Sequence, residues 1–368
     1  MTISNALLDR IGIRLPIVQA PMAGVSSPAM AAAVSEAGAL GSIAVGAADA
    51  AGAQAMIAET RARTEAPFNV NVFAHRPATP SPAIEAAWIA RFRPHFKALG
   101  AEPPVRLTEI YRSFIEDEAM LALLIAQRPA VVSFHFGLPG DAAIRALRDA
   151  GIVLLATATN LAEARMIADA GIDAVVAQGW EAGGHRGMFD PDLPDDQLGI
   201  MALTRLLVDT AKLPVIAAGG IMDGAGIAAA LALGASAAQL GTAFVAADES
   251  LADAGYRAAL ASDAAQHTQM TRAISGRPAR SLANRFTAFG ADIPADEIPA
   301  YPVAYDLGKA LNAAAKARGD FGFGAQWAGQ GAPLARATPA ARLVETLAAE
   351  LEQARGAGKQ DGDAHDIA

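Results

Sequence analysis

Two glycine-containing segments in the second half of the chain have the composition of a phosphate-binding site. The apolar run PVIAAGG ends with Gly219 and Gly220, and the run AAQLGT supplies Gln239, Gly241 and Thr242. Adjacent glycines expose backbone N–H groups, which a phosphate group can approach closely. If the two runs are strands seven and eight of a barrel, their loops lie where barrels commonly bind phosphate. The alternative is a pair of glycine-rich turns that bind no ligand.

His135 is the strongest candidate for acid/base chemistry among the six histidines. It ends the apolar run AVVSFHFG and shares one strand face with Val131 and Ser133. This placement predicts a ring that points into a barrel mouth, as an acid/base or anion-holding group. A purely structural histidine is the alternative. His75 and His185 lie in segments near the same site, and no spacing among the histidines suggests a metal site.

Two amide-bearing segments are also candidates. In FNVNV, Asn69 and Asn71 lie on one face of an expected strand, where asparagine is uncommon. Their amides either contact a planar cofactor or satisfy loop backbone. The loop QGWEAGGHRGMFDP contains Gln178, the pair Gly183 and Gly184, and the basic pair His185 and Arg186. We expect this basic pair to meet an anion, although a polar surface loop would have a similar composition.

Two of the four tyrosines lie close to a lysine in YPVAYDLGK. If the chain is helical from Asp306 onward, Tyr305 and Lys309 are four residues apart and share a helix face. A phenol and an ammonium group would then converge on one anion. A solvated helix with the lysine directed outward is the alternative.

The elements that position these residues form a repeated pattern of βα units. Short apolar runs alternate with alanine-rich segments of helical length, and the chain contains eight such runs. The predicted strands begin at Ile17, Gly41, Phe68, Ala130, Ile152, Ala174, Pro214 and Ala237. The predicted helices begin near Pro28, Ala50, Glu116, Asp141, Leu161, Gly199 and Asp223, and an eighth is expected after Glu249. Eight parallel strands favour a closed (β/α)8 TIM barrel, and an open doubly wound sheet is the alternative.

Two segments depart from the repeat. Residues 1–261 are interpreted as the barrel, with 74–115 as an insertion at its catalytic end that contributes to a substrate domain. Residues 262–345 are predicted to form a helical lid over the same end. Residues 346–368 are expected to be the end of a C-terminal helix and a polar tail.

Composition excludes several classes of protein. The net charge of −9 argues against nonspecific nucleic-acid binding, which needs a basic surface. The chain has no cysteine, so disulfides, thiolate nucleophiles and Cys-ligated metal centres are absent. Charged residues interrupt the N-terminal apolar residues, so we expect no secretory signal and a cytoplasmic location. The charge-free stretch from Ala225 to Ala247 is interpreted as a helix and a buried strand, and no membrane partner is expected.

Seven sequence strings together resemble one enzyme family. They are QAPMAGVSSP, FNVNVFAHRP, VVSFHFG, AQGWEAGGHRG, AAGGIMDG, GTAFVAADES and AQWAGQG, and they run in order over most of the chain. The set is similar to the class I nitronate monooxygenases, formerly called 2-nitropropane dioxygenases. The resemblance implies a (β/α)8 barrel with noncovalent flavin mononucleotide (FMN). It also implies a small anionic nitronate and molecular oxygen as reactants.

The resemblance also implies roles for individual residues. His135 matches the catalytic histidine of the family. Residues implied in FMN binding are Pro21 and Met22 through their backbone, Asn71 and Gln178 at the ring or ribityl portion, and Gly183, Gly219, Gly220, Gln239, Leu240, Gly241 and Thr242 at the phosphate. Tyr111, Tyr301, Tyr305 and Lys309 match residues of the substrate pocket. The string FNVNV departs from the FGVN form of related flavin barrels, which leaves the role of Asn69 open.

The activity that the resemblance implies is oxidation of alkyl nitronates by oxygen to a carbonyl compound and nitrite. Propionate-3-nitronate is the suggested substrate, because Lys309 is suited to pair with its carboxylate. One alternative is a flavin-dependent NAD(P)H:quinone or enoyl-thioester reductase on the same barrel. A phosphate-binding lyase or isomerase without redox chemistry is the other, and it would purify without flavin absorbance.

Overall fold

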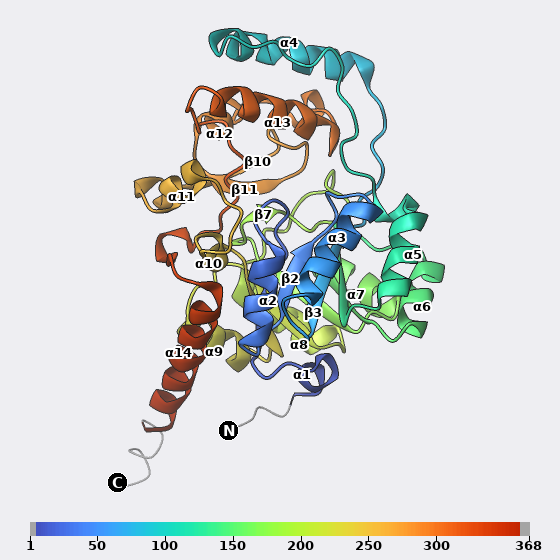
Figure 1. The fold of residues 1–368 in the computed structure, drawn as a ribbon, viewed down its shortest axis with the longest axis vertical. Helices are drawn as coiled ribbons and strands as arrows, with labels where there is room; N and C mark the ends of the chain where they lie inside the picture. Colours follow the sequence, from blue (N-terminus) through green and yellow to red (C-terminus); the bar gives the residue numbers. More distant parts are fainter. Residues whose placement is uncertain (1–4, 361–368) are drawn as a thin grey trace.

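The computed structural model describes residues 5–360 and contains a (β/α)8 barrel beneath a lid (Figure 1). The barrel strands are β1 (Ile17–Gln19), β2 (Gly41–Ala44), β3 (Phe68–Phe73), β4 (Val131–His135), β5 (Val153–Ala158), β6 (Ala174–Gln178), β8 (Val215–Ala218) and β9 (Ala237–Leu240). All pair in parallel, in the order β1-β9-β8-β6-β5-β4-β3-β2. A bridge between Val18 and Leu40 brings the two edges together. The predicted fold class and all eight predicted strands are therefore confirmed.

Two apolar layers hold the barrel together. Inside it, side chains such as Val131, Leu155, Val176 and Ile216 form one cluster. The short helix α1 (Ala6–Ile11) contributes Leu7, Leu8 and Ile11 to this cluster, at the end of the barrel opposite the lid (Figure 1). Outside the barrel, alternate residues of the same strands pack against the helices. The strands are buried on both faces, which explains their nearly continuous apolar sequences.

Seven helices of the ring begin where the sequence predicts. They are α2 (Pro28–Glu36), α3 (Ala50–Arg61), α5 (Glu118–Gln127), α6 (Asp141–Asp149), α7 (Leu161–Asp169), α8 (Ile200–Thr210) and α9 (Gly224–Ala232). The side chains of Asn160 and Asp223 accept hydrogen bonds from the first turns of α7 and α9. The stretch from Ala225 to Ala247 contains α9 and the buried strand β9. Within residues 5–360, no helix is both long and apolar enough to cross a membrane.

The eighth ring helix differs from the prediction. The segment after Glu249 forms α11 (Ala254–Leu260), which follows the four-residue α10 (Thr242–Val245) and lies beside the lid (Figure 1). The ring is completed by α14 (Ala340–Gln360), whose Leu343 and Leu347 pack with Val34 of α2 and Ile227 of α9. The barrel therefore does not end at residue 261. Predicted tail residues 361–368 lie outside the described part of the chain.

The lid is not purely helical, which corrects the expectation for residues 262–345. It contains the antiparallel pair β10 (Thr268–Thr271) and β11 (Ala279–Leu282), and β11 also pairs with the two-residue β7 (Gly184–His185) from the barrel loop after β6. Its helical elements are α12 (Arg285–Phe289), α13 (Val303–Lys316) and the 3-10 turns η2 (Asp263–Gln266), η3 (Ala295–Glu297) and η4 (Ala332–Leu334). The chain then returns to the barrel as α14.

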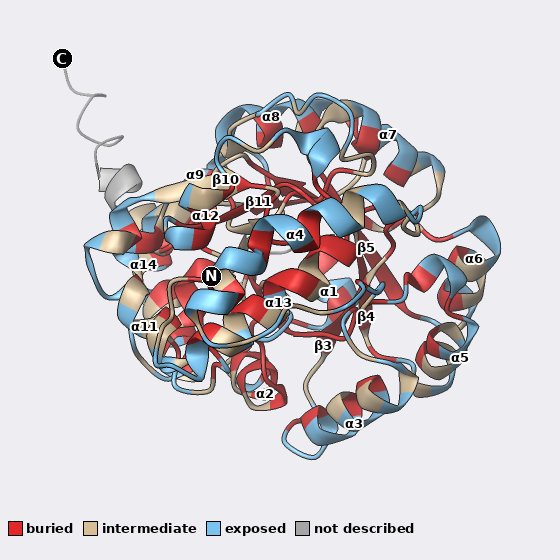
Figure 2. Cartoon of the chain, turned by 90° about the horizontal axis from the view of Figure 1, so that it is seen from above, coloured by how far each residue is buried: buried red, intermediate tan, exposed pale blue. Residues whose placement is uncertain are grey.

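The insertion at 74–115 extends the lid from the other side. It supplies α4 (Pro82–Ala98), and η1 (Phe114–Glu116) follows it. Trp88, Phe92 and Phe96 of α4 share an apolar cluster with Leu307 and Leu311 of α13. Viewed from above, α4 and α13 lie across the ring of buried strands (Figure 2). Segments from distant parts of the sequence thus cover the same end of the barrel.

Candidate functional site

A cavity of about 1060 Å³ lies between the carboxyl ends of the strands and the lid. Small-molecule sites usually occupy roughly 300–1,000 Å³, so this cavity has room for a cofactor together with a small substrate. The predicted site residues that line it are Pro21, Met22, Asn71, Tyr111, His135, Gln178, Gly183, Gly219, Gly220, Gln239, Gly241, Thr242, Tyr301, Tyr305 and Lys309. Leu240 does not line it, because its side chain is buried in the cluster beneath α14.

Glycines form a cradle at one side of the cavity, and two of them adopt conformations that other residues avoid. Gly219 and Gly220 have φ of +126° and +70°. A Cβ atom at Gly219 would lie 3.1 Å from the backbone nitrogen of Ala182. Gly241 has φ −107°, and a Cβ there would lie 3.4 Å from the Cβ of Ala20, at the cavity wall. The cradle thus lets a ligand approach the backbone closely.

Polar groups of the barrel strands occupy the floor of the cavity. The amide of Asn71 donates to the Ser133 hydroxyl at 2.9 Å and to the Ser133 carbonyl at 3.1 Å. Asn69, one pleat earlier on the same face, donates to the hydroxyl of Ser42 at 3.2 Å and does not line the cavity. Asn69 is therefore a buried group of the barrel interior in this structure, whereas Asn71 borders the site.

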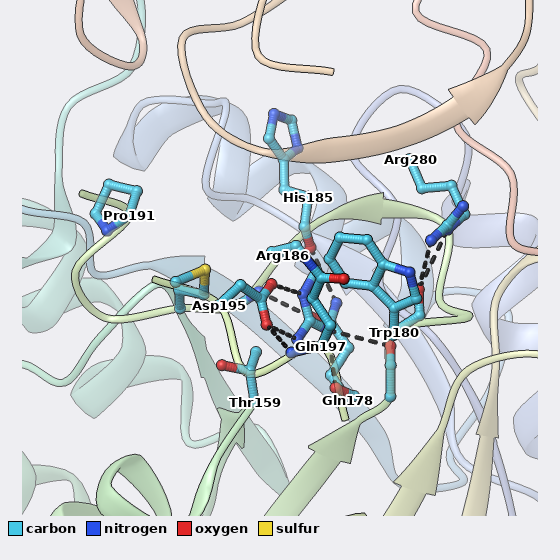
Figure 3. Close-up of polar contacts among 12 residues, drawn as sticks. Thr159, Gln178, Trp180, His185, Arg186, Pro191, Asp195, Gln197 and Arg280 are labelled. Carbon is cyan, nitrogen blue, oxygen red and sulfur yellow. Dashed lines mark hydrogen bonds and ion pairs between the residues drawn. The ribbon is translucent and has the colours of Figure 1, made fainter. Parts of the chain in front are cut away.

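The loop after β6 is organised by a buried arginine (Figure 3). The guanidinium of Arg186 forms two contacts with the carboxylate of Asp195, at 2.7 and 3.0 Å, and donates to the carbonyl of Gln178 at 2.9 Å. Gln178 in turn donates to the carbonyl of His185 at 2.9 Å. We expected His185 and Arg186 to meet an anion as a basic pair. This expectation is wrong for Arg186, because its charge is already paired and it does not line the cavity.

His185 lines the cavity from the same loop, although the sequence placed it only near the site. Its ring points towards the lid, where its Nε2 lies 2.9 Å from the hydroxyl of Ser275 (Figure 3). Burial, followed by the nearby His135 and Arg277, lowers the pKa of His185 to about 3. The ring is therefore neutral near pH 7.

His135 lies at the end of β4 and borders the cavity as predicted. Its Nε2 lies 3.3 Å from the carbonyl of His185, so this nitrogen carries the hydrogen, and its Nδ1 can accept from the hydroxyl of Thr157 at 3.1 Å. Burial is the main cause that lowers its pKa to about 4. His135 is therefore neutral near pH 7.

Tyrosines and one lysine form the wall that faces His135. Tyr111 from the insertion and Tyr305 from α13 meet edge to face, with ring centres 6.0 Å apart. The Nζ atom of Lys309 lies 4.9 Å from the centre of the Tyr111 ring and 5.4 Å from that of Tyr305. Burial lowers the pKa of Lys309, and nearby Asp306 opposes this effect. The shared face of Tyr305 and Lys309 on α13 is confirmed.

Several lining residues were missed from the sequence. Tyr256 lies in the helix that was assigned to the ring, and its hydroxyl donates to the carbonyl of Trp327. Phe136 directly follows β4, and Thr157 lies on β5. Both line the cavity beside His135, which becomes evident only once the barrel is known. Burial raises the pKa of Tyr305 to about 12, so its phenol stays protonated. In residues 5–360, no three His, Asp or Glu side chains are grouped to hold a metal ion.

The fold and site together define a barrel enzyme whose cavity combines a glycine cradle with an anion-compatible wall. The family model for nitronate monooxygenase matches residues 4–350. A Paraburkholderia phytofirmans nitronate monooxygenase is 63% identical over 95% of each chain, and one from Pseudomonas aeruginosa is 55% identical over 93% of this chain and 97% of its own. The chain belongs to the nitronate monooxygenase family, which is flavin-dependent.

A solved structure agrees with this assignment. The nitroalkane oxidase of Streptomyces ansochromogenes superimposes with a TM-score of 0.88 and is 46% identical, over 96% of this chain and 99% of its own. The similarity includes the lid as well as the barrel, because nearly the full length of both chains is aligned.

A buried histidine behind the tyrosine wall predicts how stability depends on pH. Burial, followed by Arg277, lowers the pKa of His75 from 6.5 to about 4, and the backbone of Tyr111 partly opposes this effect. The unfolded chain therefore binds a proton between pH 6.5 and 4 that the folded protein does not, so stability falls as the pH falls. We expect His75→Phe to reduce this fall by on the order of 3 kcal/mol.

Urea unfolding midpoints and slopes measured from pH 7 to pH 4.5 test this expectation. His267→Phe is the matched control, because His267 is exposed. The explanation fails if the stability curves of His75→Phe and the unsubstituted protein stay parallel across this range.

Proposed function

We propose that this protein binds FMN noncovalently and oxidises alkyl nitronates with molecular oxygen, releasing a carbonyl compound and nitrite. The observation that carries the proposal is the family match together with one cavity that holds both Lys309 and His135. A nitronate is an anion, and Lys309 offers it a positive charge on a wall of protonated phenols. Propionate-3-nitronate suits this wall, because its carboxylate can pair with Lys309 while its nitronate group reaches the floor.

The residues present fit FMN in composition and placement. We assign the phosphate to the cradle of Gly183, Gly219, Gly220, Gly241 and Thr242, together with Gln239. The backbone at Pro21 and Met22 and the amides of Asn71 and Gln178 are assigned to the ring and ribityl portions. When bound, the flavin would accept electrons from the substrate and pass them to oxygen.

The side chains around the substrate would divide the remaining work. Lys309 would hold the anion, and Tyr111, Tyr301 and Tyr305 would donate hydrogen bonds while the lid excludes water. The nitrogen of His135 that can take up a proton is Nδ1, which accepts from the Thr157 hydroxyl, because its Nε2 donates to the carbonyl of His185. An anion beside the ring raises the pKa of His135, so the ring can take and hold a proton during turnover.

Product analysis under air tests the proposal directly. The purified protein should be yellow and, when mixed with propionate-3-nitronate, should consume oxygen and release nitrite without NADH. Turnover that requires NADH and a quinone or enoyl thioester would replace this function with a reductase. A colourless protein without redox activity would point to a lyase or isomerase.

The phosphate assignment predicts a charge-specific effect at Gly241. Its backbone suits any residue, whereas the positive φ of Gly220 would strain any substitution there. Gly241→Asp should weaken FMN binding by on the order of tenfold or more, because its carboxylate would repel the phosphate. Fluorescence titration of the apoprotein with FMN and with riboflavin, which lacks the phosphate, measures the effect. Gly241→Ala is the steric control. An equal loss of affinity for FMN and riboflavin would show that the phosphate binds elsewhere.

The position of Lys309 predicts selectivity for carboxylated substrates. Lys309→Met keeps most of the stem and removes the charge, so KM should rise on the order of tenfold for propionate-3-nitronate and much less for ethyl nitronate. Lys97→Met is the matched control, because Lys97 is an exposed lysine of the lid helix α4 that does not line the cavity. Equal changes in KM for the two substrates would show that Lys309 does not contact the carboxylate.

The position of His135 predicts a defect in the chemical step. Asparagine retains a hydrogen-bond donor but cannot hold a proton near neutral pH. His135→Asn should keep its flavin and lose on the order of 10² in the rate at which nitronate bleaches the flavin. Anaerobic stopped-flow absorbance measures this rate, with His267→Asn as the control. A rate within a few-fold of the unsubstituted protein would make His135 structural.

A further inference from the structure

A tight turn in the lid contacts the site from behind. Residues 272–278 connect β10 to β11, and Gly276 adopts φ +91° where a Cβ would collide with the backbone of Pro299 and Tyr301. On one side of Gly276, Ser275 hydrogen-bonds His185. On the other side, Arg277 stacks on Phe136, with its guanidinium carbon 4.4 Å from the ring centre. This connection therefore contacts His185 directly and Phe136, the residue after His135.

Arg277 is a buried cation without a carboxylate partner. Its side chain donates to the carbonyl of Met188, and its Nε has no hydrogen-bond partner. Among the described residues, no carboxylate lies within ion-pair distance of it. Arg186, which is buried to a similar degree, is fully paired with Asp195. Burial of an unpaired charge is costly, so the absence of a partner at Arg277 calls for a functional explanation.

The charge of Arg277 persists despite its burial. Burial lowers its pKa to about 10; Tyr301, and to a lesser extent Glu163 and Asp190, partly compensate, and Arg272 adds to the lowering. The guanidinium is therefore protonated near pH 7. It is also close enough to His135 and His185 to contribute to the low pKa of both rings.

Phe136 lies between Arg277 and His135 in a chain of contacts that reaches the cavity. The ring of Phe136 lines the cavity and lies 4.4 Å from the ring of His135, centre to centre. Phe136 also has φ +76°, a conformation that is costly for a bulky residue. The guanidinium of Arg277 packs on the ring of Phe136, and Arg277 itself does not line the cavity.

We propose that Arg277 is the fixed positive charge that stabilises the substrate anion beside neutral His135, acting through the Phe136 wall. This proposal rests on the proposed function, because it takes the ligand to be a nitronate. Arg277 is a positioning and electrostatic residue and does not touch the substrate. A positive charge in an apolar wall acts on an anion in the cavity without direct contact, because little water screens the interaction.

Nitrate is a suitable probe, because it is a planar anion like the nitronate group and does not react. Binding of nitrate to the flavin-loaded protein is followed by the change in flavin absorbance. Arg277→Met should weaken nitrate binding on the order of tenfold, whereas Arg277→Lys should stay within about threefold because it keeps the charge. Neutral nitroethane, measured in the same way, should bind about equally to all forms.

Arg280→Met is the matched control for loss of a buried arginine. Arg280 is also buried, stacks on Trp180 and donates to a backbone carbonyl, but it faces the loop after β6. The Arg280→Met variant should bind nitrate as the unsubstituted protein does. Arg277→Gln keeps a donor for the Met188 carbonyl without the charge, so it should fold and match Arg277→Met.

The proposal is overturned if Arg277→Lys loses as much nitrate affinity as Arg277→Met and Arg277→Gln, or if nitroethane binding falls in parallel. Either result would make Arg277 a packing residue. Failure of the proposed function is distinguishable, because nitrate binding is measured without turnover. If the protein binds nitrate in an Arg277-dependent way but does not oxidise nitronates, the anion site is supported and only the proposed reaction is refuted.

Discussion

Removal of water from the barrel mouth is the constraint on which the chemistry of this protein depends. Burial keeps His135 and His185 neutral and Tyr305 protonated near pH 7. A site with these properties presents hydrogen-bond donors and acceptors without mobile countercharges, and an anion entering it gains strongly from each remaining cation. A few charged groups in the walls of such a cavity are therefore enough to attract an anion.

The lid that covers the cavity is built from segments that are distant in the sequence. The segment 74–115 supplies Tyr111, the β6 loop supplies β7, and the chain from β10 to α13 supplies the rest before α14 returns to the ring. Thr108 from the insertion donates to the carboxylate of Asp306 through its backbone and hydroxyl, at 2.8 and 2.9 Å. Because Asp306 lies between Tyr305 and Lys309 in sequence, this contact joins the insertion to the helix that carries the other part of the wall of tyrosines and lysine.

The eight strands could be predicted because strands buried on both faces produce apolar runs that are visible in isolation. The site residues at their carboxyl ends, such as Asn71 and Gly220, followed from the order of the strands. Other features depend on partners distant in the sequence. No local signal shows that α14 and not α11 completes the ring, that β11 pairs with Gly184, or that Arg186 is paired with Asp195. The charge state of His135 depends on burial by the lid, which its own segment does not encode.

His185 belongs to both parts of the molecule. Its carbonyl is shared by Gln178 and His135 in the barrel, its backbone pairs with Ala279 of β11, and its ring reaches Ser275 of the lid. A displacement of the lid would pull on this residue and so disturb the tautomer and orientation of His135. The orientation of the His135 ring therefore depends on a residue that also holds strand β11 of the lid, so the barrel floor and the lid share one point of attachment.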